Sequence, residues 1–452
     1  MCRRFAQSVG EGLRKVVSAG RLQRAVLEES GPWRERSYGP LQTLELFVEQ
    51  VLSADHSCQD AVARAASARV ARGEARGSLS SGPYCKARQR LSMSLVQRLG
   101  REVGQALCER KPRVWRWRGR EVKLVDGTTL WMPDTASNQV CYPQNRAQAP
   151  GLGFPLARLV GIISLSNGAM LHWASGPCEG EGSGETALLW ELSARLAAGD
   201  IVVADRYYAG YFMVARLQQM GVDVLIRQHR SRRSDFRRGE RLGVRDHVVQ
   251  WRCPARPQWM DEATYEQMPS CMRLREVQVG GWILVSTLRD HRRVSKVELH
   301  QLYCQRWKIE LDLRAIKSVM QMGQLRCKTP QMVQKEIAAH LLAYNLVRAL
   351  MAQAAALYQI GPPRELSFKA AVQLINAFHE VLRHAPRSRV GLMQAHLLGA
   401  IASRRLPHRP GRAEPRGLKR RKDQHDFLKK PRQQLREQLL KRKRKCIEAA
   451  LR

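Results

Sequence analysis

The chain has 452 residues, of which 44% are hydrophobic, so it can bury a large core over two or three domains and is not a disordered chain. Its 77 lysines and arginines outnumber 40 aspartates and glutamates, and a globular chain with a net charge of +37 is expected to bind a polyanion, DNA or RNA, rather than a membrane. The 11 cysteines are scattered, with no CxxC and no zinc-ligand spacing, which excludes a disulfide framework and a zinc site and favours reduced thiols in the cytoplasm.

Residues 1–118 are predicted to be mostly helical. Apolar residues recur at helical steps in 41–52 and 91–107, and an Ala- and Arg-rich stretch, 61–76, lies between them. The segment begins without the apolar core of a signal peptide. Because basic residues are spread throughout it, a DNA-reading domain and a helical packing domain with a solvated basic face are equally good interpretations.

Two aspartates are predicted to close strands. Residues 121–130 read as a strand that delivers Asp126 to its end, followed by a turn, although an Asp-Gly pair alone most often marks only a hairpin turn. Residues 200–204 form a short apolar run, typical of a strand buried on both faces, and Asp205 follows its last residue. In sheets covered by helices, ligand-binding groups gather at the carboxyl ends of strands, so Asp126 and Asp205 are expected to meet there.

The strands and helices around the two aspartates follow from the same periodicities. Between the two aspartates we predict a hairpin, with strands at 158–166 and 170–175, and then a helix at 185–197. After Asp205 we predict a helix at 211–220 and a strand at 222–226.

A β-rich insertion is predicted next. Seven arginines crowd residues 227–241, and short alternating runs follow at 247–251, 272–279 and 282–288. Two long helices are predicted nearer the end of the chain, at 335–358 and 368–382. The first carries ionisable side chains and is therefore predicted to be a buried helix rather than a membrane span. The tail is basic and broken by prolines, with a short basic helix predicted at 439–451.

The stretch YCQRWKIELDLRAIK, residues 303–317, is predicted to be one amphipathic helix. At about 100° per residue, Tyr303, Glu310 and Lys317 share one face and Arg306 lies close to it. A separate apolar stripe runs beside them through Leu302, Ile309, Leu313, Ile316 and Met320.

Three carboxylates, Asp126, Asp205 and Glu310, thus lie on two strands and a helix. The sequence contains no Walker-type phosphate loop, no GxSxG and no HExxH. Hard oxygen ligands of this kind suit phosphodiester cleavage with two magnesium ions about 3.5–4 Å apart, and manganese can substitute for magnesium.

These residues also carry a family resemblance. YCQRWKIELDLRAIK contains the Tyr-x2-Arg-x3-Glu-x6-Lys signature, and the chain resembles bacterial insertion-sequence transposases of the IS-four group. VDGTT resembles the first-aspartate motif of that family and ADRYYAGYF the second. The flanking segments PGLGFPLARLVGIISLSNG, GSGETALL, EPRGLKRR and KKPR agree as well, so that the similarity runs from about Val122 to Arg432.

The resemblance implies an α/β protein with a ribonuclease H-like mixed sheet and flanking helices, acting as a DDE transposase. Asp126, Asp205 and Glu310 would be the catalytic, metal-binding residues. DNA contacts are assigned to Tyr303, Arg306, Lys317 and Arg206, and also to Trp282, whose counterpart in hairpin-forming members stacks on a flipped base. Packing inside the insertion is the equal alternative for Trp282.

The expected activity is cut-and-paste transposition: cleavage at terminal inverted repeats, a hairpin intermediate and strand transfer into target DNA. The expected partners are these DNA segments and a second subunit in a homodimer, in the cytoplasm of a bacterium and at its nucleoid, with no membrane partner. The expected domains are a helical DNA-end-binding domain at 1–118 and a core formed by 119–227 and 294–400. A β-rich insertion at 228–293 divides the core, and a basic tail follows at 401–452. A nuclease without strand transfer and a DNA-binding protein that has lost catalysis are the alternatives; the presence of all three acids argues against the latter.

Overall fold

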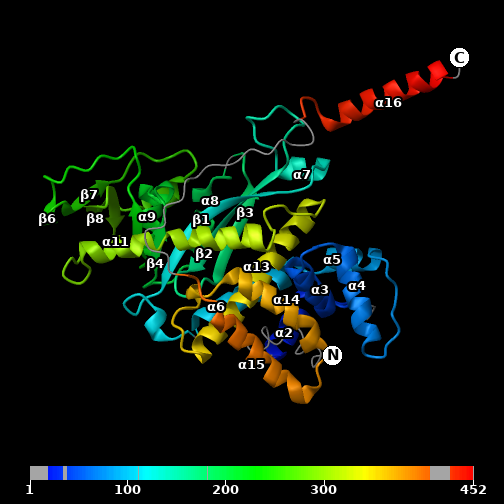
Figure 1. Cartoon of the computed structure of the whole chain (residues 1–452). Coiled ribbons are helices and arrows are strands. Elements are labelled where there is room, and N and C mark those ends of the chain that lie inside the picture. Colours follow the sequence, from blue (N-terminus) through cyan, green and yellow to red (C-terminus); the bar gives the residue numbers. More distant parts are fainter. Residues whose placement is uncertain (1–18, 34–37, 110, 181, 408–427, 451–452) are drawn as a thin grey trace.

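The structure is a computed structural model that describes residues 19–33, 38–109, 111–180, 182–407 and 428–450. Its described strands form one nine-stranded mixed sheet in the order β3-β2-β1-β4-β5-β9-β8-β7-β6 (Figure 1). Their bounds are β1 Val122–Trp131, β2 Leu156–Ser164, β3 Met170–Pro177, β4 Ile201–Ala204, β5 Asp223–Arg227, β6 Glu240–Gly243, β7 Asp246–Arg252, β8 Cys271–Val279 and β9 Trp282–Ser286.

Helices precede the sheet, alternate with its strands and follow it. The first group is α2 Ala19–Glu29, α3 Pro40–Leu52, α4 Cys58–Val70, α5 Gly82–Arg90 and α6 Met93–Glu109. Among the strands lie α7 Ala136–Cys141, α8 Glu185–Ser193, α9 Tyr211–Gln219 and α10 Glu262–Glu266. After them come α11 Lys296–Cys304, α12 Trp307–Arg314, α13 Pro330–Leu357, α14 Phe368–His384, α15 Arg387–Ser403 and α16 Arg432–Ala450.

The sheet changes direction at its middle. Strands β1, β4 and β5 are parallel, whereas β2 and β3 on one side and β9 to β6 on the other are antiparallel to their neighbours. The predicted insertion therefore contributes four strands that extend the same sheet, because β9 hydrogen-bonds to β5.

Helices cover both faces of the sheet, and the apolar side chains divide between them by strand parity. On β4, Ile201 and Val203 belong to the larger core cluster, while Val202 and Ala204 belong to the cluster packed under α8 and α9. All four are buried, which confirms a strand covered on both faces.

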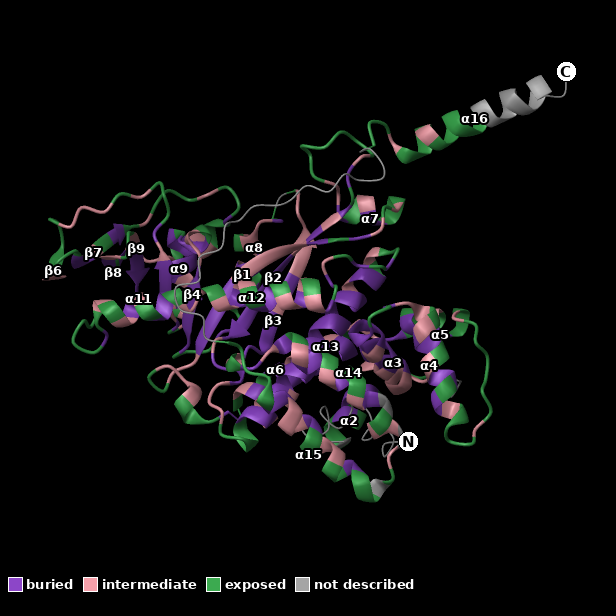
Figure 2. Ribbon diagram, viewed as in Figure 1, coloured by how far each residue is buried: buried purple, intermediate pink, exposed green. Residues whose placement is uncertain are grey.

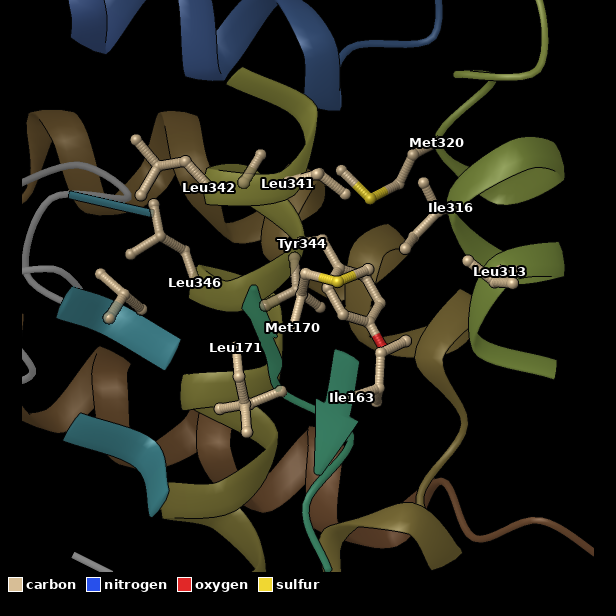
Figure 3. Packing of buried hydrophobic residues seen from close by; sticks show 14 of the residues in the cluster. Ile163, Met170, Leu171, Leu313, Ile316, Met320, Leu341, Leu342, Tyr344 and Leu346 are labelled. Carbon is tan, nitrogen blue, oxygen red and sulfur yellow. The ribbon is translucent and has the colours of Figure 1, made fainter. Parts of the chain in front are cut away.

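Helix α13 forms the centre of the larger cluster. Its side chains Leu341, Leu342 and Tyr344 pack between β3 and the turn that follows α12, where Ile316 and Met320 are buried (Figure 3). Helices α3 and α6 also pack on α13, so the N-terminal helices share this core with the sheet. Figure 2 shows the resulting continuous buried zone. No helix among the described residues is long and apolar enough to span a membrane.

Two predicted elements differ in the structure. Strand β1 does not end in a turn after Asp126; it continues to Trp131, because its antiparallel pairing with β2 extends over Gly127 and beyond. The helix predicted over 303–317 is three pieces: α11 ends at Cys304, α12 begins at Trp307, and a π-helical turn spans Ala315–Val319.

The nine cysteines from Cys58 to Cys327 are free thiols. The EPRGLKRR segment, residues 414–421, and residue 451 of the predicted tail helix lie outside the described residues. The described part of that tail includes α16.

Candidate active site

The parallel pairing of β1 with β4 brings two predicted site residues to one edge of the sheet. Val125 pairs with Ala204, and the next residue on each chain is Asp126 or Asp205. Since neighbouring strands lie about 4.8 Å apart, the two acids begin from adjacent backbone positions. Asp126 keeps the parity of Leu124, and Asp205 that of Val203, which faces the larger core cluster.

A buried ion pair sets this register from the other end of the strands. Lys123 Nζ lies 2.6 Å from Asp200 Oδ2, and both residues are less than a tenth exposed. A buried charge without its partner destabilises the fold. A one-residue slip of β4 against β1 would separate Lys123 from Asp200 and is therefore strongly disfavoured.

Helix α12 lies over β1 on the same face and supplies the third acid (Figure 2). Its buried side chains Ile309 and Leu313 leave Glu310 at the edge of the interface. Asp312 fixes the helix from behind, with Oδ1 bonded to Arg348 of α13 and Oδ2 lying 2.7 Å from Arg364.

One guanidinium group connects the helix acid with the strand acid. Arg306 donates from Nη2 to Glu310 Oε1 at 2.6 Å and from Nη1 to Asp126 Oδ2 at 3.4 Å. The two carboxylates, 184 positions apart in the chain, therefore lie within reach of a single cation. Asp205 is the most exposed of the three acids, and its Oδ1 caps the turn that follows it by accepting from the Arg206 N–H.

The environment of Asp126 disfavours its charged form more than water does. Burial raises the pKa of Asp126 to about 6, although the Gly127 N–H and Arg306 both act to lower it. The charges of Glu185 and Glu310 raise this pKa further. A cation added beside Asp126 would offset both effects and favour the carboxylate.

The donor set fits a divalent metal ion by chemistry, since three carboxylates supply hard oxygen ligands. Within the described part of the chain, however, no three acidic, histidine or cysteine side chains stand close enough together to share an ion. Arg306 lies between two of the acids instead, and all three acids keep part of their side-chain surface open to solvent.

The residues predicted to contact DNA have different environments. Tyr303 is only 4% exposed and lies in the core, not on a polar stripe, and burial raises its pKa to about 12. The ring of Trp282 packs against Tyr303 at 5.6 Å between centroids, under the guanidinium of Arg227. Trp282 thus lies against α11 and is half-buried.

Two further predicted contacts are more open. Lys317, in the π-helical turn, is half-buried, which lowers its pKa, and the described residues offer it no carboxylate partner. Arg206 is half-buried beside Asp205, with Nε 3.9 Å from Asp205 Oδ1.

A fourth carboxylate borders the site and was missed by sequence reasoning. Glu185, the first residue of α8, accepts a hydrogen bond from Tyr208 at 3.1 Å. It lies against the opposite side of β1, where a Cβ on Gly127 would stand 2.5 Å from its carboxyl carbon. The GSGETALL segment was a signal for it, but the segment alone does not show that Glu185 reaches β1.

The chain as a whole resembles known proteins. A family model described as "Transposase DDE domain" matches residues 117–346, just over half of the chain. The chain is 29% identical over 352 residues to "Transposase InsG for insertion sequence element IS4" of Escherichia coli (strain K12), covering 74% of this chain and 76% of that protein. A solved structure, "Cryo-EM structure of piggyBac transposase synaptic complex with hairpin DNA (SNHP)", aligns with a TM-score of 0.42 and 9% identity, over 91% of this chain and 86% of that one.

Proposed function

Because the chain belongs to the family of transposases with a DDE domain, we propose that it moves an insertion sequence by cut-and-paste transposition, with Asp126, Asp205 and Glu310 as its catalytic acids. Membership makes the chain a DNA transposase, an enzyme of a family that uses divalent metal ions. The proposal adds the residues, the two magnesium ions and the sequence of steps. The observation that carries it is the single Arg306 guanidinium that bonds both Asp126 and Glu310.

The proposed fold is ribonuclease H-like. The strand order β3-β2-β1-β4-β5, with its three antiparallel strands followed by two parallel ones, supports this assignment. The proposed units are a helical DNA-end-binding domain at 1–118, the core at 119–227 and 294–400, the insertion at 228–293 and a basic tail at 401–452. Two subunits are proposed to act as a homodimer that joins two DNA ends.

The acids are proposed to change partners when DNA and metal bind. Bound magnesium or manganese ions would act as Lewis acids on the attacking and leaving oxygens of the phosphodiester. Arg306 would then give up its two carboxylates, and its guanidinium would be free to contact a DNA phosphate beside the cut. Lys317 and Arg206 are proposed to add further phosphate contacts.

Trp282 is proposed to stack on a flipped base during hairpin formation. It starts β9 directly after Gly280 and Gly281, whose positive φ angles build the tight turn from β8. Base–aromatic stacking contributes about 1–3 kcal/mol, enough to hold an unpaired base outside the duplex. For this step the indole must leave Tyr303, against which it packs.

The test is Asp126→Asn, assayed on duplexes that carry the inverted repeats flanking the coding region. Cleavage in magnesium should fall at least about 1,000-fold, as losses of single catalytic groups do elsewhere. The affinity of the variant for the same duplex should stay within about twofold of the wild-type affinity, because lysine and arginine side chains provide most of the binding to DNA. Asp134→Asn, an exposed aspartate beyond the end of β1, is the matched control and should cleave normally.

Cleavage that persists in the Asp126→Asn protein would refute the assignment of the acids. Products that are cut but never joined to a target would favour the second candidate, a ribonuclease H-like nuclease without strand transfer. A wild-type protein that binds the repeats but does not cut them in magnesium or manganese would instead indicate a transposase-derived DNA-binding protein.

A further inference from the structure

A large hollow lies at the end of the sheet opposite the acids. Its volume is about 890 Å³, and its walls come from the start of β5, from β6 to β8 and from the loop after β9. Six arginines line it: Arg118, Arg120, Arg273, Arg289, Arg292 and Arg293. We call this hollow the arginine groove.

The carboxylates of the groove are already neutralised. Asp223 pairs with Arg120 at 2.5 Å, and Asp290 with Arg293 at 3.3 Å. The remaining acid of the lining, Glu240, pairs with Arg273. Arg118 pairs with Glu298, which lies outside the lining.

Two arginines are left without such a partner. Arg289 and Arg292 are exposed, and no carboxylate of the described residues lies within ion-pair distance of either. Their neighbour His291 is exposed as well. The groove therefore carries an excess of positive charge that the folded chain does not balance, and it is concave.

The loop that presents these arginines is held firmly at both ends. At its start, Thr287 donates to the Asp223 carboxylate. At its end, the carbonyl of Val294 accepts from Arg275, which is fully buried and paired with Asp246 at 2.6 and 2.8 Å. A buried ion pair adds little stability but fixes geometry, so the loop has a defined shape.

The groove and the acids cannot hold the same phosphates. The groove lies where β1 and β5 begin: Arg120 comes two residues before Val122, the first residue of β1, and Asp223 is the first residue of β5. Asp126 lies four residues after Val122. At about 3.3 Å per residue, roughly 13 Å of β1 therefore separates the groove from Asp126, which lies towards the opposite end of the strand.

We infer that the arginine groove binds the phosphate backbone of a second stretch of double-stranded DNA, separate from the stretch cut at the acids. Planar guanidinium groups bind phosphate oxygens in pairs of hydrogen bonds, and unpaired arginines on a rigid loop do so with little loss of freedom. The inference rests on the proposed function, which requires DNA on both sides of the joining step. The second stretch is either a distant part of the bound end or the target duplex.

The test uses the full-length protein with Arg289→Ala and Arg292→Ala combined. The matched control, Arg237→Ala with Arg238→Ala, removes two exposed charges from the same insertion that pair with Asp235 outside the groove. Affinity for a linear non-cognate duplex of about 40 bp is measured as a function of salt. The groove variant should bind about tenfold less tightly, and its salt slope should fall by about 2, close to 0.9 per lost phosphate contact.

Two further arms identify the source of the DNA. If the groove holds the target, strand transfer falls about tenfold while cleavage of terminal-repeat duplexes stays normal. If it holds a distant part of the end, affinity for terminal-repeat duplexes also falls, for long duplexes and not for short ones, and cleavage and transfer fall together. Arg289→Lys with Arg292→Lys keeps the charge and should show an intermediate loss, which separates phosphate binding from misfolding.

Equal effects of the groove and control variants, or no change in affinity and transfer, would overturn the inference. Failure of the proposed function gives a different result. In that case wild-type cleavage is absent or does not depend on Asp126, while the duplex-binding measurement still reports on the groove.

Discussion

At the scale of single residues, Arg306 has the most unusual position in the site. Burial alone would lower its pKa, but the hydrogen bond to Glu310 and the nearby charges of Tyr303, Glu310 and Asp126 raise it instead. The guanidinium thus neutralises the two carboxylates in the protein alone, and in the proposed mechanism metal ions would take over this neutralisation. Replacing Arg306 should therefore change how strongly the two carboxylates bind a metal ion.

Arg306→Gln should lower the melting temperature in a chelating buffer, because Asp126 and Glu310 then face each other without a cation. Millimolar manganese should raise the melting temperature of the variant by about 2–4 °C more than that of the wild type, since no guanidinium competes for the carboxylates. Arg314→Gln, an exposed change at the end of α12, is the control. An equal manganese shift in all three proteins would contradict the exchange.

At position 127 only glycine leaves room for the Glu185 side chain. Gly127→Ala would place a Cβ against the Glu185 carboxylate, so β1 or α8 must shift next to Asp126. We expect single-turnover cleavage to fall by about 10- to 100-fold, because a displacement of about 1 Å can cost that much. Gly176→Ala on β3, where the nearest atom is 3.7 Å away, should leave the rate near normal, and a normal rate for both variants would argue against this packing.

At the scale of elements, the break between α11 and α12 and the position of α13 decide where the site residues point. The break lets Tyr303 turn into the core while Glu310 stays at the sheet edge. Helix α13 then holds α6, β3 and the α12 turn together through buried polar groups. Asn345 is the clearest of these, with its side chain bonded to Met170 N, Met170 O and Gly100 O.

Asn345→Ala should therefore lower the free energy of unfolding by about 2–4 kcal/mol, because it leaves several buried backbone groups without partners. Asn376→Ala on α14 removes one partly buried bond to Leu52 O and should cost about 1 kcal/mol. Urea denaturation of both variants measures the difference. A loss below that of Asn376→Ala would show that α13 is not linked to β3 in this way.

At the scale of the whole molecule, buried histidines make the folded chain sensitive to acid. Burial lowers the pKa of His340 to about 3, and the pKa values of His56 and His172 to about 4. The ring of His340 stacks on His56 at 5.9 Å, between α13 and the N-terminal helices. Above their unfolded pKa of about 6.5 these groups are neutral in both states; below it the unfolded chain takes up protons that the folded chain does not. Stability should therefore fall as the pH drops from about 6.5 towards 4.

His340→Gln should reduce this loss by up to about 2 kcal/mol between about pH 7 and about pH 5, whatever its effect on stability at pH 7. The readout is the difference between urea midpoints at the two pH values. His396→Gln, an exposed change on α15, should leave the difference as in the wild type. A His340→Gln protein with unchanged pH dependence would refute the assignment.

The sequence alone was enough to predict the strand that contains Asp126 and the strand that ends just before Asp205. It also predicted the burial of Ile309, Leu313 and Ile316 beside Glu310. These features follow from periodicity along short stretches, since parity on a strand and spacing on a helix determine which side chains share a face. The catalytic roles of the three acids stay predictions until they are tested in solution.

Only the tertiary structure decided which distant groups meet. Arg306 could be placed on a helix by spacing, but its bond to Asp126 joins residues 180 positions apart. The burial of Tyr303, the extension of β1 past Gly127, the approach of Glu185 and the arginine groove all depend on contacts between separate elements. Such contacts are determined by packing and register across the whole sheet, and they cannot be predicted from local patterns in the sequence.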